Sequence, residues 1–177
     1  MSPVILWEQI EDRRAAKPLQ NFSCTTELPR TEGGRKLLHP KPWEREVQSH
    51  LRQTSVGLKA GQLLLAGRDS ISDRIVAAAH LIPDRSSSTT LVVRIAAIGV
   101  CTTVRGQGGK VADRTLDEVR RVIFADAQKL GVGVAVATAN IHTHNRPSQL
   151  LFERAGFEPL SIPAPDSDYQ GWVYRVV

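Results

Sequence analysis

The sequence predicts an α/β (α+β) fold in which one mixed sheet packs against two main helices. Short apolar runs bounded by turn residues dominate the middle of the chain. A long amphipathic helix, a continuous apolar run, a shorter helix and a last apolar segment follow. Strands that come first and then alternate with helices are typical of a sheet covered by helices.

Three strands are expected before the first main helix. Residues 62–66 are apolar and end at Gly67, and residues 74–82 stop at Pro83. The third strand, residues 91–101, follows a polar loop and leads into a glycine-rich turn. These three runs therefore form the first half of the predicted sheet.

Two helices and further strands are expected after that turn. Residues 111–130 place apolar side chains at helical spacing, and Gly131 is a typical C-cap. Residues 132–139 form a small apolar run, as expected for a strand covered on both faces. Asn145 can cap the second helix, which ends at Gly156, and Phe157 with residues 172–177 supplies the last strand or strands.

The chain divides into residues 1–60, whose organisation is poorly defined, and a core of residues 61–177. Prolines and glycines interrupt the first part, although residues 43–53 have helical character. Residues 4–14 fit either a short helix or a strand. We expect the first part to pack on the core and form a single domain with it.

Bulk composition excludes several classes of protein. The 177 residues carry a net charge of +5, but the basic residues are spread along the chain and no run of five occurs. A dedicated nucleic-acid surface is therefore not indicated. No stretch approaches the length of a membrane span, and the N-terminus lacks a signal-peptide core. Cys24 and Cys101 have no metal-type spacing, so no metal site is expected and two reduced thiols in a cytoplasmic protein are predicted.

The turn after the third strand carries the strongest functional signal. Glycines at 106, 108 and 109 allow the backbone to approach a ligand closely. The free N–H groups at the start of the next helix point into this turn and, with the helix dipole, favour an anion. We therefore predict a phosphate or pyrophosphate site here.

Two common phosphate-binding patterns fit poorly. A P-loop needs Ser or Thr after Gly109-Lys110, where this chain has Val111, and Val104 stands at the position of its first glycine. The dinucleotide fingerprint begins at Gly106 but also ends on Val111.

A third pattern fits. The segment Arg105-Gly106-Gln107-Gly108-Gly109-Lys110 resembles the acetyl-CoA pyrophosphate loop of the Gcn5-related N-acetyltransferase (GNAT) superfamily, with Lys110 in place of a final Gly or Ala. A second segment, from Asn145 through Leu151-Phe152 to Ala155-Gly156-Phe157, is similar to the superfamily's helix motif. The resemblance covers about residues 61–177. It implies a mostly antiparallel central sheet with a splayed strand pair, flanked by helices.

The resemblance also implies acetyl-CoA as cosubstrate and a set of residues that bind it. The strand would offer backbone groups to the pantetheine arm, and the turn would hold the pyrophosphate. Asn145 would bind the pantetheine arm or a water, or act only as a helix cap. The implied set is Ile98, Gly99, Val100, Arg105, Gly106, Gln107, Gly108, Gly109, Lys110, Val111 and Asn145.

The catalytic groups of relatives do not transfer. The leaving-group tyrosine aligns with Phe152, and the glutamate base of some relatives aligns with Asn140. His142 and His144 lie before the second helix and are the candidate catalytic residues, because imidazole titrates in a suitable range. His80 is expected to be a satisfied strand residue, and Cys101 a small thiol with no catalytic role.

Three functions follow from this resemblance. The first is N-acetyl transfer to a primary amine of an unidentified acceptor, and the second is an acyl-CoA-binding module without turnover. The third is a toxin that acetylates aminoacyl-tRNA, since Phe22-Ser23-Cys24 faintly resembles a segment of such enzymes. The C-terminal strand can either close the sheet or pair across a homodimer.

Overall fold

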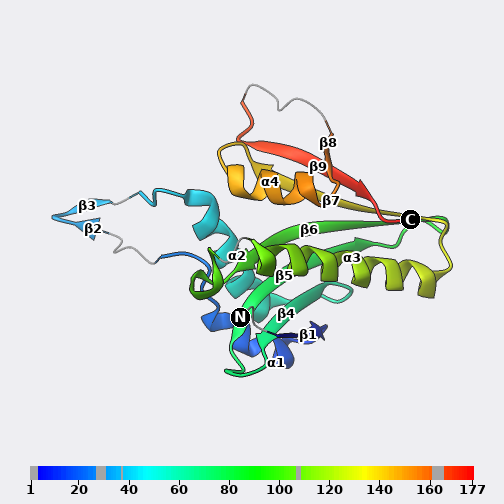
Figure 1. Cartoon of the computed structure of the whole chain (residues 1–177), viewed down its shortest axis with the longest axis horizontal. Coiled ribbons are helices and arrows are strands. Elements are labelled where there is room, and N and C mark those ends of the chain that lie inside the picture. Colours follow the sequence, from blue (N-terminus) through cyan, green and yellow to red (C-terminus); the bar gives the residue numbers. More distant parts are fainter. Residues whose placement is uncertain (1–3, 27–30, 37, 107–108, 161–165) are drawn as a thin grey trace.

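A seven-stranded sheet runs through the molecule (Figure 1). The computed structural model describes residues 4–26, 31–36, 38–106, 109–160 and 166–177. The strand order is β1-β4-β5-β6-β7-β9-β8. The strands are β1 Ile5–Ile10, β4 Leu63–Asp69, β5 Ile75–Asp84, β6 Thr90–Val100, β7 Val134–His142, β8 Glu158–Pro159 and β9 Tyr169–Arg175.

One neighbouring pair in this sheet is parallel. Strands β6 and β7 run in the same direction, with α3 as the crossover between them, and the other neighbouring pairs are antiparallel. The predicted α/β (α+β) fold is thereby confirmed, as is the mostly antiparallel sheet that the GNAT resemblance implied.

Helices cover both faces of the sheet. They are α1 Arg13–Ala16, α2 Pro42–Gly57, α3 Lys110–Leu130 and α4 Arg146–Arg154, with 3-10 turns at Lys17–Asn21 and Thr102–Val104. The buried side chains of α3 and α4 pack with one face of the sheet, and those of α1, the first 3-10 turn and α2 pack with the other. Two cores therefore sandwich the sheet.

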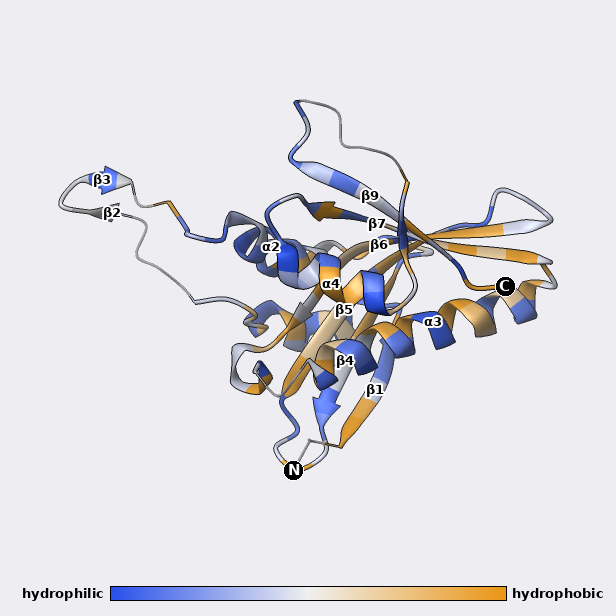
Figure 2. Cartoon of the chain, turned by 45° about the horizontal axis from the view of Figure 1, so that its top comes forward, coloured by the Kyte–Doolittle hydropathy of each residue, from blue (hydrophilic) through white to orange (hydrophobic). Residues whose placement is uncertain are grey.

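Helix α3 shows why these elements form where they do. Leu116, Val119 and Ile123 recur at helical spacing and are fully buried, which produces the apolar stripe seen in Figure 2. Gly131 ends the helix in the left-handed conformation, with φ 68°. The helix predicted for residues 111–130 thus differs from the observed one by one residue.

The chain before residue 61 contributes one strand to the same sheet. The segment of residues 4–14 contains strand β1, Ile5–Ile10, which pairs antiparallel with β4, and the start of the short helix α1. Asp12 caps α1 by accepting the N–H of Ala15 at 2.9 Å. A hairpin of β2 Thr31–Glu32 and β3 Arg35–Lys36 projects away from the sheet in Figures 1 and 2. Among the described residues, the helices are too short or too polar to cross a membrane.

Candidate functional site: a cleft between splayed strands

The parallel strand pair separates halfway along its length. Strands β6 and β7 are paired from Thr90 with Val134 to Ile95 with Ala139. Beyond this point β6 stays with β5 as far as Val100, whereas β7 stays with β9 as far as His142. Since each strand stays with its outer partner beyond this point and the two no longer pair with each other, their inner edges diverge and leave an opening.

A bulge in β6 marks the point of separation. His80 of β5 lies opposite Ala97, but the next residue, Leu81, lies opposite Ile95, so Ala96 is the extra residue. Such a bulge bends its strand and increases the local twist. The sheet is therefore opened by the geometry of β6 itself.

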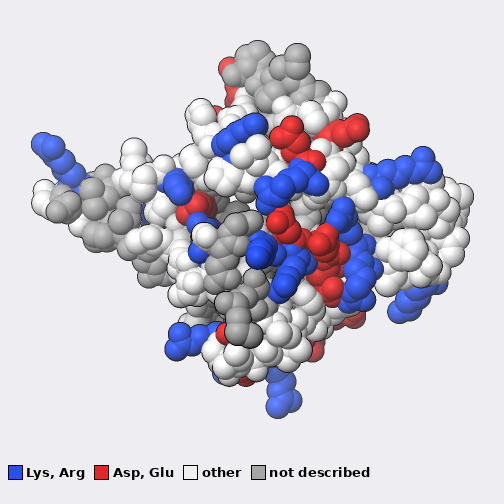
Figure 3. Space-filling model, in the orientation of Figure 1, with Lys and Arg blue, Asp and Glu red and all other residues white. Residues whose placement is uncertain are grey.

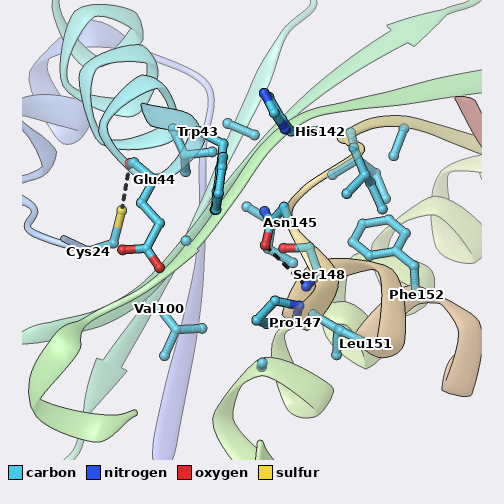
Figure 4. Close-up of a pocket in the computed structure, with 18 of the residues that line it drawn as sticks. Cys24, Trp43, Glu44, Val100, His142, Asn145, Pro147, Ser148, Leu151 and Phe152 are labelled. Atoms are coloured by element: carbon cyan, nitrogen blue, oxygen red, sulfur yellow. Dashed lines mark hydrogen bonds between the residues drawn. The ribbon is translucent and has the colours of Figure 1, made fainter. Parts of the chain in front are cut away.

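A cleft of about 700 Å³ occupies this opening. Cys24, Trp43 and Glu44 lie on one wall, and residues of α4 lie on the other (Figure 4). The α4 wall includes the N-cap Asn145 and, from the helix itself, Pro147, Ser148, Leu151 and Phe152. The backbone of β6 runs along the cleft at the predicted positions Ile98, Gly99 and Val100.

The glycine turn and the start of α3 close one end of the cleft. Gly106 and Gly109 have φ values of 83° and 77°, which side chains rarely adopt. The first hydrogen bond of α3 joins the N–H of Asp113 to the carbonyl of Gly109, at 2.9 Å. The N–H groups of Lys110, Val111 and Ala112 thus precede the helical ladder and, within the described residues, are available to an anion.

The other predicted residues of this turn differ in their placement. Arg105, Gly106, Gly109 and Val111 line the cleft, whereas Lys110 is not among the lining residues. Gln107 and Gly108 lie outside the described residues, so their proposed roles remain predictions.

Arg105 is held by protein groups on the wall opposite α4. Its guanidinium donates to Glu44 at 2.8 Å, to the carbonyl of Val100 at 3.1 Å and to the carbonyl of Cys24. Burial opposes ionisation of Glu44, but Arg105, a hydrogen bond from Thr25 and nearby Lys41 outweigh it and lower the pKa of Glu44. Arg105 therefore fixes the start of the turn to α2.

A second arginine, which could not be recognised from the sequence, lies beside the glycine turn. Arg154 lines the cleft at the end of α4 and pairs with Asp113 at 2.6 Å. A Cβ at Gly109 would lie 3.0 Å from Nη2 of Arg154. Its position beside the first turn of α3 places a cation next to the free N–H groups.

Elsewhere on α3, basic side chains are paired with acidic ones. Arg120 pairs with Asp117, and Arg121 pairs with Glu118. Figure 3 accordingly shows positive and negative side chains intermixed over the face that carries α3 and α4.

Aromatic side chains gather at the opposite end of the cleft. The ring of His142 lies 4.8 Å from that of Trp43 and 5.4 Å from those of Tyr169 and His144. The Tyr169 hydroxyl donates to Glu46, and this hydrogen bond, with burial and nearby carboxylates, raises the pKa of Tyr169 to about 12. His142 lines the cleft, but His144 is not among its lining residues.

Comparison with known proteins identifies this architecture. No protein-family model and no curated protein matches the chain. Solved structures match nearly its whole length. A protein from Desulfovibrio desulfuricans, described as an acetyltransferase of the GNAT family, has a TM-score of 0.58 at 16% identity, covering 98% of this chain and 100% of that one. The chain has the GNAT fold.

Two further structures show the same fold. AtaTR bound with acetyl-CoA has a TM-score of 0.59 at 12% identity, covering 97% of this chain and 93% of that one. Variants of the spermidine/spermine N-acetyltransferase SpeG from Vibrio cholerae give 0.56 at 10% identity, covering 98% and 95%.

The second GNAT-like motif lies on α4. Asn145 accepts the N–H of Ser148 at 3.3 Å, so its side chain acts as the N-cap while also lining the cleft. Phe152 is 1% exposed and packs edge-to-face on Phe157, with ring centroids 4.8 Å apart. Asn140 lines the cleft from β7 and lies opposite Gly171 in β9.

The two cysteines differ in their surroundings. Cys24 is buried beside the cleft, where burial raises the pKa of its thiol to about 11. Cys101 is partly exposed, and its sulfur lies 3.2 Å from Oγ1 of Thr103. A thiol with so high a pKa is almost wholly protonated at neutral pH, which argues against Cys24 as a nucleophile.

Proposed function

We propose that this protein is an N-acetyltransferase that transfers the acetyl group of acetyl-CoA to a primary amine by direct attack. The observation that carries the proposal is the cleft itself, which has an anion-binding turn at one end and an aromatic, acidic wall at the other. A cosubstrate with a pyrophosphate and a long, thin arm suits such a shape. The GNAT fold and the neighbour bound with acetyl-CoA support the assignment.

The anion end would hold the pyrophosphate. The N–H groups of Lys110, Val111 and Ala112 precede the first hydrogen bond of α3 and can bind an anion, and Arg154, paired with Asp113, adds a guanidinium beside Gly109. Arg105 acts by fixing the turn, since its guanidinium is occupied by Glu44 and two carbonyls.

The middle of the cleft would hold the pantetheine arm and the thioester. Strand β6 exposes an inner edge past Ile95, where β7 has turned away. Backbone groups at Ile98, Gly99 and Val100 lie along this edge, and an N–H there can stabilise the oxyanion that forms when the amine attacks. Asn145 borders the same channel.

The acceptor would enter at the aromatic end. Trp43 and Tyr169 offer ring faces on which an ammonium group can rest, and Glu46 adds a negative charge close by. Nδ1 of His142 accepts the backbone N–H of His144 at 3.1 Å, so the neutral ring of His142 carries its proton on Nε2. Of the two predicted histidines, His142 is therefore the one proposed to contact the substrate, as a hydrogen-bond donor.

A second candidate is an acyl-CoA-binding module without turnover. Phe152 favours it, because a phenyl ring stands where many relatives carry the tyrosine that protonates the leaving thiolate. Proximity and ordered water can nevertheless support transfer without that hydroxyl. Turnover therefore decides between the two candidates.

The third candidate, acetylation of aminoacyl-tRNA, has one structural feature in its favour. Phe22 and Cys24 pack on β6 beside the cleft, since a Cβ at Gly99 would lie 3.1 Å from each side chain. The same segment also belongs to the core under α2, which is sufficient to explain its burial.

Release of CoA thiol in the presence of amines tests the proposal. We expect acetyl-CoA with n-propylamine or spermidine to give CoA and the acetylated amine, identified by mass spectrometry. The variant Ser148→Trp should abolish release because its indole fills the cleft. Glu153→Trp, on an exposed position of the same helix, should retain it. Binding of acetyl-CoA without transfer to any amine would favour the module instead.

A further inference from the structure

Two histidines that are 30 residues apart in sequence meet on the α2 side of the sheet. His50 lies on α2 and lines the cleft, whereas His80 lies on β5 and is 3% exposed. Nε2 of His50 lies 2.8 Å from Nδ1 of His80, with the rings 5.1 Å apart. This distance is a hydrogen bond between the two rings.

Gln62 determines which ring nitrogen carries each proton. Its Oε1 lies 3.2 Å from Nε2 of His80, and a carbonyl oxygen can only accept, so Nε2 of His80 must donate. In the neutral ring Nδ1 of His80 is then an acceptor, and Nε2 of His50 is the donor to it. The neutral ring of His50 therefore has its lone pair on Nδ1.

His142 and His50 both line the cleft, and their neutral rings leave opposite groups for a ligand. The lone pair on Nδ1 of His142 already accepts a backbone N–H, so this ring offers a ligand the donor Nε2–H. In His50, the hydrogen bond within the described residues runs through Nε2, which leaves the basic Nδ1 for a ligand. Of these two rings, His50 is the one built to take a proton.

The position of His50 matches the place where the reaction would occur. Ala96 and Ala97 line the cleft with it, at the bulge where β6 leaves β7. Trp43 and Val47, which lie one or two turns earlier on α2, line the same wall. His50 therefore lies on the same wall of the cleft as Trp43, and it lines the cleft together with the residues of the bulge.

The surroundings of His50 keep it neutral. Burial and the charge of Arg94 on β6 lower the pKa of His50 below its ordinary value. Burial, His50 and Arg94 lower the pKa of His80 to about 4. At neutral pH the lone pair on Nδ1 is consequently available.

We propose that His50 is the general base of the reaction, and that His80 and Gln62 are positioning residues that hold it in the required tautomer. This inference rests on the proposed acetyl transfer. Nδ1 of His50 takes one proton from the ammonium group, and the freed lone pair of the amine forms the C–N bond. The C–S bond breaks, and the second amine proton leaves with the CoA thiolate as the free thiol.

Nitrogen NMR of the histidine rings tests the tautomers without any turnover. Long-range proton–nitrogen correlation at pH 7, assigned with His50→Gln and His80→Gln, should show His50 protonated on Nε2 and bare on Nδ1. Gln62→Glu should keep this pattern, because its carboxylate also accepts from His80, whereas Gln62→Leu should mix the tautomers. A neutral His50 protonated on Nδ1 would overturn the proposal.

Kinetics with n-propylamine as acceptor tests the role of the base. His50→Gln should lower kcat/KM for the amine by about 100-fold without changing the Kd for acetyl-CoA. Its residual rate should rise about tenfold per pH unit, because only amine already deprotonated in solution can react. Gln53→Ala, exposed on the same helix, should match the unsubstituted protein.

Failure of the proposed acetyl transfer and failure of the role of His50 would give different results. Loss of acetyl-CoA binding in the unsubstituted protein would reject the proposed function. Normal transfer by His50→Gln, with an unchanged pH profile, would reject only the role of His50. If n-propylamine is not acetylated, the NMR result alone decides whether His50 has the required tautomer.

Discussion

The guanidinium of Arg105 donates to the carboxylate of Glu44 at 2.8 Å, across 61 positions of sequence. Arg105 begins the glycine turn, and Glu44 lies in the first turn of α2. One ion pair therefore joins the glycine turn to the wall of the cleft that α2 forms. The Glu44 side chain is only 18% exposed, and water therefore screens the pair less than it would at the surface.

Breaking this pair should weaken acetyl-CoA binding indirectly. We expect Glu44→Gln and Arg105→Gln each to reduce affinity by about tenfold, because the turn loses its anchor. The double variant should lose much less binding free energy than the sum of the two single losses, with a coupling of roughly 1 to 2 kcal/mol. Calorimetric titration of the four proteins measures their affinities and therefore the coupling, and urea unfolding measures their stabilities. Additive effects would show that the pair does not act as a unit.

The cap of α3 should be sensitive to a single methyl group. Gly109→Ala places a Cβ 3.0 Å from Arg154 and forces a left-handed conformation on alanine, which costs about 1 to 2 kcal/mol. Both the free energy of unfolding and the affinity for acetyl-CoA should fall. Gly133→Ala is the matched control, since a Cβ there has open space and ordinary φ. Equal effects of the two substitutions would contradict the assignment of this turn.

Phe152 offers a gain-of-function test. The side chain is buried on the α4 wall of the cleft, where the GNAT-like motif usually places tyrosine. Phe152→Tyr should raise kcat for CoA release about tenfold, because its hydroxyl can protonate the leaving thiolate. Phe152→Leu should lower stability without this gain. A tyrosine variant slower than the unsubstituted protein would show that the hydroxyl does not reach the reacting sulfur.

Acid should destabilise the protein through His80. Its folded-state pKa of about 4 lies below the ordinary value of 6.5, so between these values the unfolded chain binds more protons than the folded one. The free energy of unfolding should therefore fall as pH is lowered from about 6.5 to 4, by on the order of 2 to 3 kcal/mol. Urea unfolding at several pH values measures this slope, and His80→Gln should flatten it. An unchanged slope in that variant would assign the effect to other groups.

The core of the fold could be predicted because its signals are local. The stripe of α3, the apolar runs of the strands and the glycine turn each lie within a short window of sequence. Strand β1 was not distinguished from a helix, because it is an edge strand with exposed Leu6 and only one well-buried residue, Ile10. Its identity depends on pairing with β4, which is a tertiary interaction.

The site could be predicted only in part, for the same reason. The turn and Asn145 lie in motifs, so their positions on the cleft follow from sequence. Arg154, Trp43 and Tyr169 come from three separate elements and match no pattern. The pairing of His50 with His80 likewise requires α2 to pack on β5, which no local pattern in the sequence encodes.

Calorimetric titration of the protein with acetyl-CoA and with free CoA shows whether the cleft is a cosubstrate site. We expect micromolar binding of both, lost in Ser148→Trp, whose side chain fills the cleft, and kept in Glu153→Trp. Absence of binding, or equal binding by both variants, would contradict a cosubstrate site between β6 and β7.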